Sequence, residues 1–185
     1  MTAWLLPTRA AANRFGEALG RRLTAGCTVA LAGDLGAGKT TLAQAIARGL
    51  GVTSYVASPT FGLIHEYPGP VPMFHFDTYR LQRAEDLQDL GFHEFFERGG
   101  VVVVEWADKF AELLPADRLT LRIELGEEAL SGDLEEDVPR VVEAEAAGAD
   151  YISLLAALEV DPALRDLLAR ARYVDGEKCL HPISF

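Results

Sequence analysis

A glycine-rich segment that ends in a lysine and two threonines carries the clearest chemistry in this chain of 185 residues. Residues 33–40, GDLGAGKT, fit the pattern GxxxxGK(S/T) in full and lie between an apolar run and a segment of helical periodicity. The glycines let successive backbone amides face a phosphate group, and the following helix adds the positive end of its dipole. The segment predicts an ATP site in which Lys39 contacts the β- and γ-phosphates and Thr40 binds Mg²⁺.

A metal site of this kind needs a carboxylate in addition to the phosphate loop, commonly at the end of a buried strand. Residues 101–104 are four consecutive valines, which predicts a strand buried on both faces, and Glu105 follows them directly. We therefore predict that Glu105 completes the magnesium site with Thr40. A solvated strand end is the alternative for Glu105, and Trp106 either lines the nucleotide site or belongs to the core.

Residues 75–80, HFDTYR, form a second group of polar side chains. In a strand, the period of two would place His75, Asp77 and Tyr79 on one face. Asp77 is then a candidate for orienting the attacking water or a metal-bound water. Arg80 is a candidate for placing positive charge on the transferred phosphoryl group. A hydrogen-bonded structural network at the sheet edge is the alternative for His75 and Asp77.

A proline segment, residues 58–61 (SPTF), lies between the helix after the phosphate loop and the group around Asp77. The proline fixes one backbone angle and moves Ser58 out of the helical region. Thr60 is a candidate switch residue that senses the γ-phosphate. An ordinary proline turn is the alternative.

Apolar periodicity and chain breakers predict the elements that hold these residues. Thr8 is a plausible N-cap of a helix that ends at Gly26. Two strand-like runs, residues 61–67 and 73–79, are separated by a break too short for a crossover helix, so they should form an antiparallel hairpin. Short helices are expected over residues 83–90 and 92–98, and further strands over residues 27–32, 119–125 and 138–144.

These elements add up to an α/β fold, a P-loop NTPase sandwich with a mixed parallel and antiparallel sheet. Residues 1–160 are predicted to form the ATPase domain. Residues 161–185 are predicted to be a C-terminal extension with a short helix and an irregular tail.

The charge of the chain is unevenly distributed. It carries 17 Lys and Arg against 28 Asp and Glu, a net charge of −11. Residues 124–145 hold nine of the acidic residues and one basic residue, Arg140. Because the chain has no block of lysines and arginines to neutralise a phosphate backbone, direct tight binding to nucleic acid is not expected. The acidic segment is either a solvated loop with an edge strand or a docking surface for a basic partner.

Nothing in the sequence indicates a membrane or a secretory route. No run of about 18 apolar residues occurs, and residues 1–7 lack the features of a secretory signal. Cys27 and Cys179 form no metal-binding spacing and are expected to be plain thiols. We therefore expect a cytoplasmic protein without membrane contact.

Together, the strings GDLGAGKTT, SPTF, HFDTYRL and VVVVEWADK resemble the TsaE family, formerly called YjeE. The motifs occur in the family's order and with similar spacing, and the resemblance covers about residues 5–158. It implies a bacterial P-loop ATPase that is required for making threonylcarbamoyladenosine in transfer RNA. It also implies slow ATP hydrolysis by the protein alone and work in a complex with TsaB and TsaD. By the same resemblance, TsaD is expected to carry the transfer chemistry, and tRNA is expected to be reached only through the partners.

The resemblance also assigns roles to individual residues. It places Lys39, Thr40 and Thr41 on the family's phosphate and magnesium residues, Asp77 on its acidic HxDxYR residue, and Glu105 with Trp106 on its Glu-Trp pair. Thr8 falls in a region that lies near the adenine in the family. The predicted nucleotide residues are Gly33, Gly36, Ala37, Gly38, Lys39, Thr40, Thr41, Thr8 and Trp106; the predicted metal ligands are Thr40 and Glu105; the predicted catalytic residues are Asp77, Glu105 and Arg80.

The position of Arg80 also predicts slow hydrolysis by the chain alone. Fast phosphoryl transfer needs positive charge at the γ-phosphate beyond lysine and magnesium, and the motifs supply Arg80 for that purpose. Arg80 lies just past a predicted strand end, where loop motion could hold it and Asp77 out of place until a partner docks. We therefore expect a magnesium-dependent ATPase with weak intrinsic activity that partners stimulate.

Two other functions use the same phosphate and metal groups. A small-molecule kinase usually brings several arginines on a mobile lid, whereas residues 124–145 are strongly acidic, which argues against a kinase. The second is an assembly switch that binds a nucleotide but hydrolyses little of it. The sequence does not distinguish this switch from a slow ATPase, because both need the same phosphate and metal groups.

Overall fold

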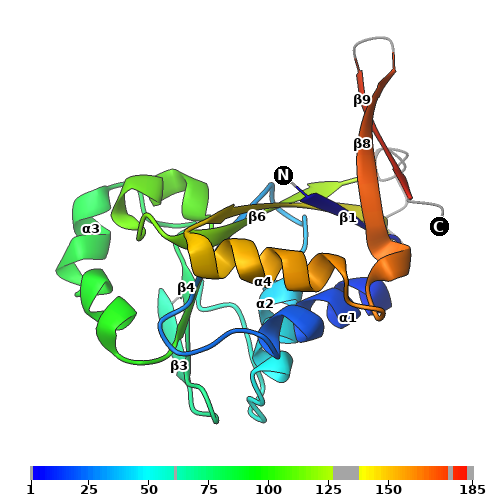
Figure 1. The fold of residues 1–185 in the computed structure, drawn as a ribbon. Coiled ribbons are helices and arrows are strands. Elements are labelled where there is room, and N and C mark those ends of the chain that lie inside the picture. The colour runs from blue at the N-terminus through cyan, green and yellow to red at the C-terminus, as the bar shows by residue number, and fades with distance from the viewer. Residues whose placement is uncertain (1, 61, 127–137, 175–176, 183–185) are drawn as a thin grey trace.

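The computed structural model describes residues 2–60, 62–126, 138–174 and 177–182, and within them one mixed sheet organises the chain (Figure 1). The strands are β1 (Thr2–Leu6), β2 (Thr28–Ala32), β3 (Ile64–Tyr67), β4 (Met73–Asp77), β5 (Val101–Glu105), β6 (Arg118–Leu125), β7 (Arg140–Ala147), β8 (Leu168–Val174) and β9 (Glu177–Pro182). Their order in the sheet is β3-β4-β5-β2-β6-β7-β1-β8-β9. The four neighbouring strands β4, β5, β2 and β6 are parallel, and antiparallel pairs flank them on both sides. The predicted mixed sheet is therefore confirmed.

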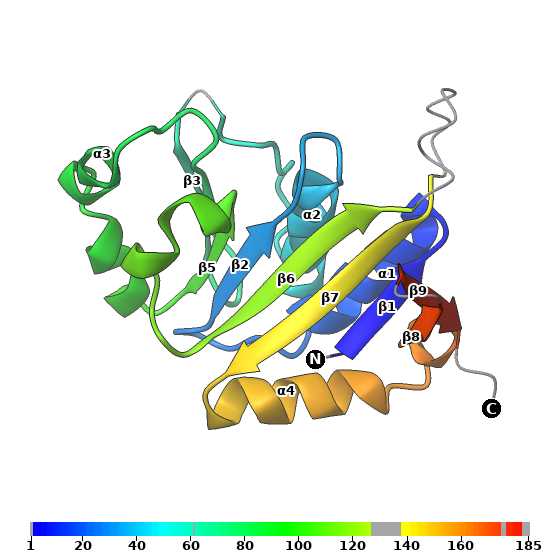
Figure 2. The same ribbon diagram turned by 90° about the horizontal axis from the view of Figure 1, so that it is seen from above.

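Helices cover both faces of the sheet (Figures 1 and 2). One apolar cluster joins the sheet to α1 (Arg9–Gly20), α2 (Lys39–Gly49) and α4 (Ala149–Glu159). The other joins it to α3 (Ala84–Asp89) and the 3₁₀ helices η1 (Phe92–Glu97) and η2 (Ala107–Leu113). No helix in the described part of the chain is both long and apolar enough to cross a membrane.

Strand β5 is buried on both faces, as the four valines predicted. Val101 and Val103 pack in the cluster with α1 and α2, whereas Val102 and Val104 pack in the cluster with α3. Successive side chains of a strand point to opposite faces, so this alternation places Glu105 on the same face as α2. The predicted hairpin is also present, since β3 and β4 pair antiparallel.

The predicted end of the first helix is wrong. The helix begins after Thr8, whose hydroxyl accepts a hydrogen bond from the Ala11 N–H at 3.1 Å, but it ends at Gly20 and not at Gly26. Leu23 continues the helical spacing and is buried, yet it lies in a connection that leads to β2. The apolar spacing therefore continues past the end of the helix, because Leu23 packs into the core from the connection between this helix and β2.

The predicted irregular tail is also wrong. After the short helix η4 (Arg165–Leu167), β8 and β9 form an antiparallel hairpin, and β8 pairs with β1 at the edge of the sheet (Figure 1). Neither β1 nor α4 was predicted from the sequence, and the division at residue 160 stays a prediction. Residue 61 of the proline segment and residues 127–137 of the acidic segment lie outside the described residues.

Candidate functional site

The motifs that the sequence singled out meet at one edge of the sheet. Strand β2 leads into the phosphate loop, the adjacent strand β5 ends at Glu105, and β4 ends at Asp77. In the parallel register, Glu105 lies opposite Leu31 of β2 and Asp77 of β4. Since the carboxyl ends of parallel strands share one edge, where α/β proteins bind ligands, the strand order brings three separate motifs together.

The phosphate loop has a backbone that needs glycine. Gly33, Gly36 and Gly38 have φ angles of +137°, +82° and +105°, values that residues with a side chain rarely adopt. A Cβ on Gly33 would also lie 2.2 Å from the Ile123 carbonyl oxygen of β6. Helix α2 begins directly after Gly38, and its first N–H groups are available to an anion.

The side chain of Lys39 lies inside the phosphate loop and is only 4% exposed. Its Nζ donates hydrogen bonds to the carbonyl oxygens of Gly33 at 2.7 Å and Asp34 at 2.8 Å. The same Nζ lies 3.5 Å from the centre of the Trp106 ring. Phosphate oxygens are charged, and they attract an ammonium more strongly than the two carbonyls do. Lys39 is thus held beside the place where a nucleotide phosphate would lie.

Burial lowers the pKa of Lys39 below its ordinary value, and nearby carboxylates oppose that shift only in part. The opposing carboxylates belong to Glu105, Asp108, Asp77 and Asp34. A bound phosphate would add negative charge beside the ammonium and would favour its protonated form. Nucleotide binding and protonation of Lys39 should therefore support each other.

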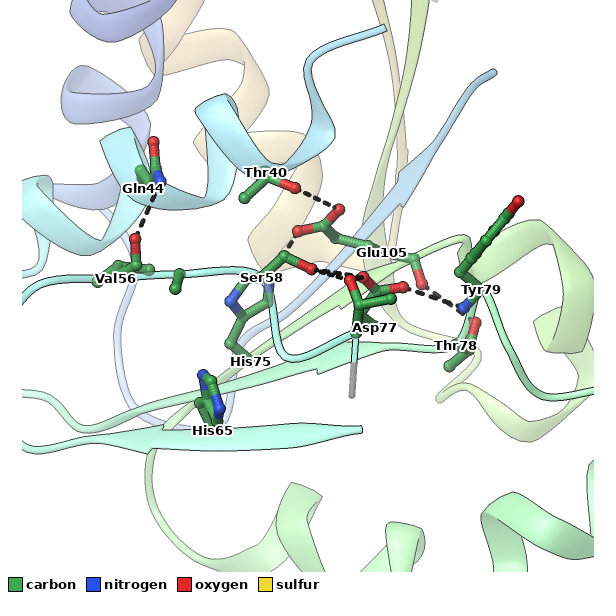
Figure 3. A network of polar contacts seen from close by, with 12 residues as sticks. Thr40, Gln44, Val56, Ser58, His65, His75, Asp77, Thr78, Tyr79 and Glu105 are labelled. Atoms are coloured by element: carbon green, nitrogen blue, oxygen red, sulfur yellow. Dashed lines mark hydrogen bonds and ion pairs between the residues drawn. The ribbon is translucent and has the colours of Figure 1, made fainter. Parts of the chain in front are cut away.

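Thr40 and Glu105, the two predicted metal ligands, are in direct contact (Figure 3). The Thr40 hydroxyl donates to Oε2 of Glu105 at 2.9 Å, and Glu105 is only 2% exposed. Hydroxyl and carboxylate oxygens suit Mg²⁺, which usually takes its other ligands from water and phosphates. The described residues contain no group of three or more His, Cys, Asp or Glu side chains that could hold a metal. A magnesium ion at Thr40 and Glu105 would depend on the nucleotide for further ligands.

His75 holds the other oxygen of Glu105. Its Nε2 lies 2.8 Å from Oε1 of Glu105, and the imidazole is fully buried. Its Nδ1 is also buried and has no hydrogen-bond partner among the residues that the structure describes. The two contacts, from His75 and Thr40, fix the carboxylate of Glu105 with Oε2 directed at the start of α2.

Asp77 anchors the proline segment (Figure 3). Its Oδ2 accepts hydrogen bonds from Ser58 Oγ at 2.6 Å and Thr60 Oγ1 at 2.7 Å, and its Oδ1 accepts one from the Tyr79 N–H at 3.0 Å. Burial raises the pKa of Asp77, but these hydrogen bonds outweigh burial and hold the pKa below its ordinary value. The network therefore stabilises the fold above the ordinary aspartate pKa, and this contribution is lost as the pH falls through the lowered folded pKa.

The two residues just before the proline segment, Val56 and Ala57, are tied to α2 and β3. Gln44 Nε2 donates to the Val56 carbonyl at 2.9 Å, and the Tyr67 hydroxyl bonds both the N–H and the carbonyl of Ala57. Neither Gln44 nor Tyr67 was predicted from the sequence to belong to the site. Gln44 lies one helical turn after Thr40, a spacing that places both on the same side of α2 and could have drawn attention to it.

Tyr79 does not share a strand face with His75 and Asp77, so that prediction is wrong. Strand β4 ends at Asp77, and the Tyr79 ring instead lies 4.9 Å from the ring of Trp106, centre to centre. Trp106 has a φ angle of +59°, is half-buried and contacts the Lys39 ammonium. Trp106 therefore lies beside the phosphate loop, in contact with Lys39.

Arg80 lies exposed in the turn after β4. Lys109, which the sequence analysis did not single out, donates to the carbonyls of Thr78, Tyr79 and Leu81 and so holds this turn in place. The hydroxyl of Thr8 caps α1. The predicted roles of Thr8 and Thr41 in nucleotide binding and of Arg80 in catalysis stay predictions. A further residue that the sequence analysis did not link to the site, Arg140, contacts the phosphate loop from β7.

Comparisons with known proteins point to one family. The family model described as threonylcarbamoyl adenosine biosynthesis protein TsaE matches residues 6–132. The tRNA threonylcarbamoyladenosine biosynthesis protein TsaE of Bacillus subtilis is 48% identical over 99 residues, which cover 53% of this chain and 61% of that protein. The Treponema pallidum protein of the same name is 40% identical over 110 residues, covering 60% of this chain and 82% of that protein.

A solved structure shows the same fold. The crystal structure of YdiB from Bacillus subtilis superposes with a TM-score of 0.70 at 31% sequence identity. The superposition covers 86% of this chain and 96% of that one. The likeness thus extends over most of the sheet and its helices.

Proposed function

The chain belongs to the TsaE family of threonylcarbamoyl adenosine biosynthesis proteins and has a role in that biosynthesis, and we propose that its part is to bind and slowly hydrolyse ATP with Mg²⁺. The observation that carries the proposal is the contact between Thr40 and Glu105 at the start of α2, beside the buried ammonium of Lys39. This arrangement offers a cation for the β- and γ-phosphates, and the Thr40 hydroxyl and the Glu105 carboxylate would hold a metal ion that neutralises phosphate charge.

The proposed division of labour rests on the family resemblance and agrees with the charge of the chain. The net charge of −11 makes this chain a poor partner for the tRNA backbone. We place it in the cytoplasm in a complex with the TsaB and TsaD proteins, in which tRNA is contacted by the partners. In this arrangement ATP on this chain controls or drives the complex, and TsaD performs the transfer.

Asp77 is proposed to orient the attacking water and Arg80 to stabilise the transferred phosphoryl group. A carboxylate oxygen can accept two hydrogen bonds, and Oδ1 of Asp77 receives one from the Tyr79 N–H, which leaves a position for water. Arg80 is exposed and lies in the turn that Lys109 holds. A partner that docks on this turn would position the guanidinium at the nucleotide.

Phosphate release by the chain alone is expected to be very slow and to rise at least about tenfold when TsaB and TsaD are added. Asp77→Ala should remove most of that activation and leave ATP affinity within about a few-fold of wild type, because Asp77 is not part of the phosphate loop. The measurement is steady-state phosphate release with saturating ATP and Mg²⁺, with and without the two partners, alongside ATP binding.

The matched control for Asp77→Ala is Ser58→Ala, which removes one hydrogen bond of the network and keeps the carboxylate. If Ser58→Ala lost as much activation as Asp77→Ala, the carboxylate would serve the structural network alone. Unstimulated phosphate release combined with ATP-dependent assembly of the complex would support the assembly switch, and phosphate transfer to a small molecule would support a kinase.

A further inference from the structure

Arg140 reaches the phosphate loop from a strand on the far side of β6. Its Nε donates to the Ala37 carbonyl oxygen at 2.9 Å, and its Nη1 donates to the Val138 carbonyl oxygen at 2.6 Å. The same side chain passes close to Gly38, since a Cβ on that glycine would lie 3.0 Å from Nε of Arg140. Arg140 lies beyond residues 6–132, the part of the chain that matches the family model.

The contact fixes the direction of one backbone amide of the loop. The Ala37 carbonyl and the Gly38 N–H belong to the same peptide group, and the described residues contain no cis peptide bond. In a trans peptide the C=O and the N–H point in opposite directions. With Arg140 bonded to the carbonyl, the Gly38 N–H points away from that bond. In a loop of this kind the backbone N–H groups face the phosphate, so this N–H would be directed at the ligand.

The contact also makes that amide a stronger donor. A hydrogen bond to the carbonyl of a peptide polarises the whole group, so its N–H carries more positive charge. The donor here is a guanidinium, and charge-assisted hydrogen bonds are about twice as strong as neutral ones. The Gly38 N–H should therefore favour an anion more than an ordinary loop amide does.

Arg140 differs from Lys39 in what happens when a nucleotide arrives. Lys39 holds the Gly33 and Asp34 carbonyls from within the loop, and a phosphate competes directly for its ammonium. Arg140 instead bonds the Ala37 carbonyl, which accepts no hydrogen bond from Lys39, so this bond does not have to break when Lys39 turns to a phosphate. It can keep the loop in its binding shape after Lys39 has turned to the phosphates.

We propose that Arg140 is a positioning residue of the phosphate site, which fixes and polarises the Ala37–Gly38 peptide so that the Gly38 N–H donates to the β-phosphate of a bound nucleotide. The proposal rests on the proposed nucleotide-binding function. It assigns to β7 a role in ligand binding besides its place in the sheet.

The test compares Arg140→Gln with Arg118→Gln. Arg118 is a matched control because it too donates to a backbone carbonyl, that of Pro115 at 2.7 Å, and lies at the opposite end of the β6–β7 pair. By isothermal titration calorimetry, Arg140→Gln should bind ADP about tenfold more weakly than wild type, and Arg118→Gln should stay within about twofold. In ¹⁵N-labelled, nucleotide-free protein, the amide proton of Gly38 should shift upfield in Arg140→Gln, and that of Gly36 should not.

ADP affinity within about twofold of wild type in folded Arg140→Gln, or an unshifted Gly38 amide, would overturn the inference. If Arg140→Gln does not fold, Arg140→Lys takes its place, because a lysine keeps the charge but lacks the fork that donates to two carbonyls. That variant should lose about threefold in ADP affinity, and wild-type affinity would overturn the inference. A wild-type chain that binds no ADP would overturn the proposed function itself, whereas normal wild-type binding with unchanged Arg140→Gln binding overturns only the role of Arg140.

Discussion

Lys39→Ala is expected to abolish detectable ATP binding while the chain remains folded. The Lys39 ammonium is 4% exposed and lies in the phosphate loop, so a nucleotide would contact it without surrounding water. Charge-assisted hydrogen bonds to two phosphates are together worth about 3 kcal/mol or more, which corresponds to at least about 100-fold in affinity. The fold should persist because the side chain bonds only two carbonyls of its own loop and the ring of Trp106.

ATP affinity of the Lys39→Ala variant can be measured by calorimetry, with circular dichroism as the check on folding. Lys109→Ala is the matched control, because Lys109 also donates to backbone carbonyls but holds the turn after β4. Its ATP affinity should stay within about a few-fold of wild type. A folded Lys39→Ala variant that binds ATP as wild type does would refute the phosphate loop as the nucleotide site.

Glu105→Gln is expected to keep ATP binding in the absence of metal and to lose magnesium-dependent hydrolysis by at least about 100-fold. Glutamine has the same size, and its oxygen can still accept the hydrogen bond from Thr40 while its NH₂ group faces Nε2 of His75. The change therefore removes the negative charge and keeps the shape of the side chain. Because Glu105 is buried at the end of β5, water cannot take its place as easily as at an exposed site.

Titrating Mg²⁺ against bound ATP tests this expectation directly. Glu112→Gln, at an exposed position of η2, removes an equal charge outside the site and should leave the metal dependence unchanged. If Glu105→Gln kept the wild-type metal dependence, Glu105 would be a structural partner of His75 and Thr40. Asp77 would then be the better candidate for the metal.

The sequence predicted the parts of this protein that depend on neighbouring residues. The phosphate loop could be recognised because its glycines are needed by the local backbone, at φ angles that other residues rarely adopt. The four valines of β5 predicted a strand buried on both faces, because apolar and polar residues alternate only in a strand that has one face in water. Four motifs in order sufficed for the family resemblance, which the family model confirms.

Predictions were weaker where an element is short or apolar on all sides. The sequence does not predict helix α4 or strand β1, and it predicts an irregular tail where the structure has the strands β8 and β9. Strand β1 has five residues and is completed by hydrogen bonds to β7 and β8. Such elements are stabilised by their partners in the sheet, so their own sequence contains little of the signal.

Only the tertiary structure decided which side chains meet at the site. The strand order puts β4 beside β5, and the pairing of these strands brings His75 into contact with Glu105, although the two residues are 30 positions apart in the sequence. The same order carries β7 past the phosphate loop and gives Ala37 its hydrogen bond from Arg140. Periodicity fixes which face of a strand a residue occupies but not which strand lies next to it, because strand order depends on burial of the whole sheet. For that reason the sequence identified the phosphate loop and Glu105 as the candidate metal ligand, whereas the residues that hold both in place became visible only in the folded chain.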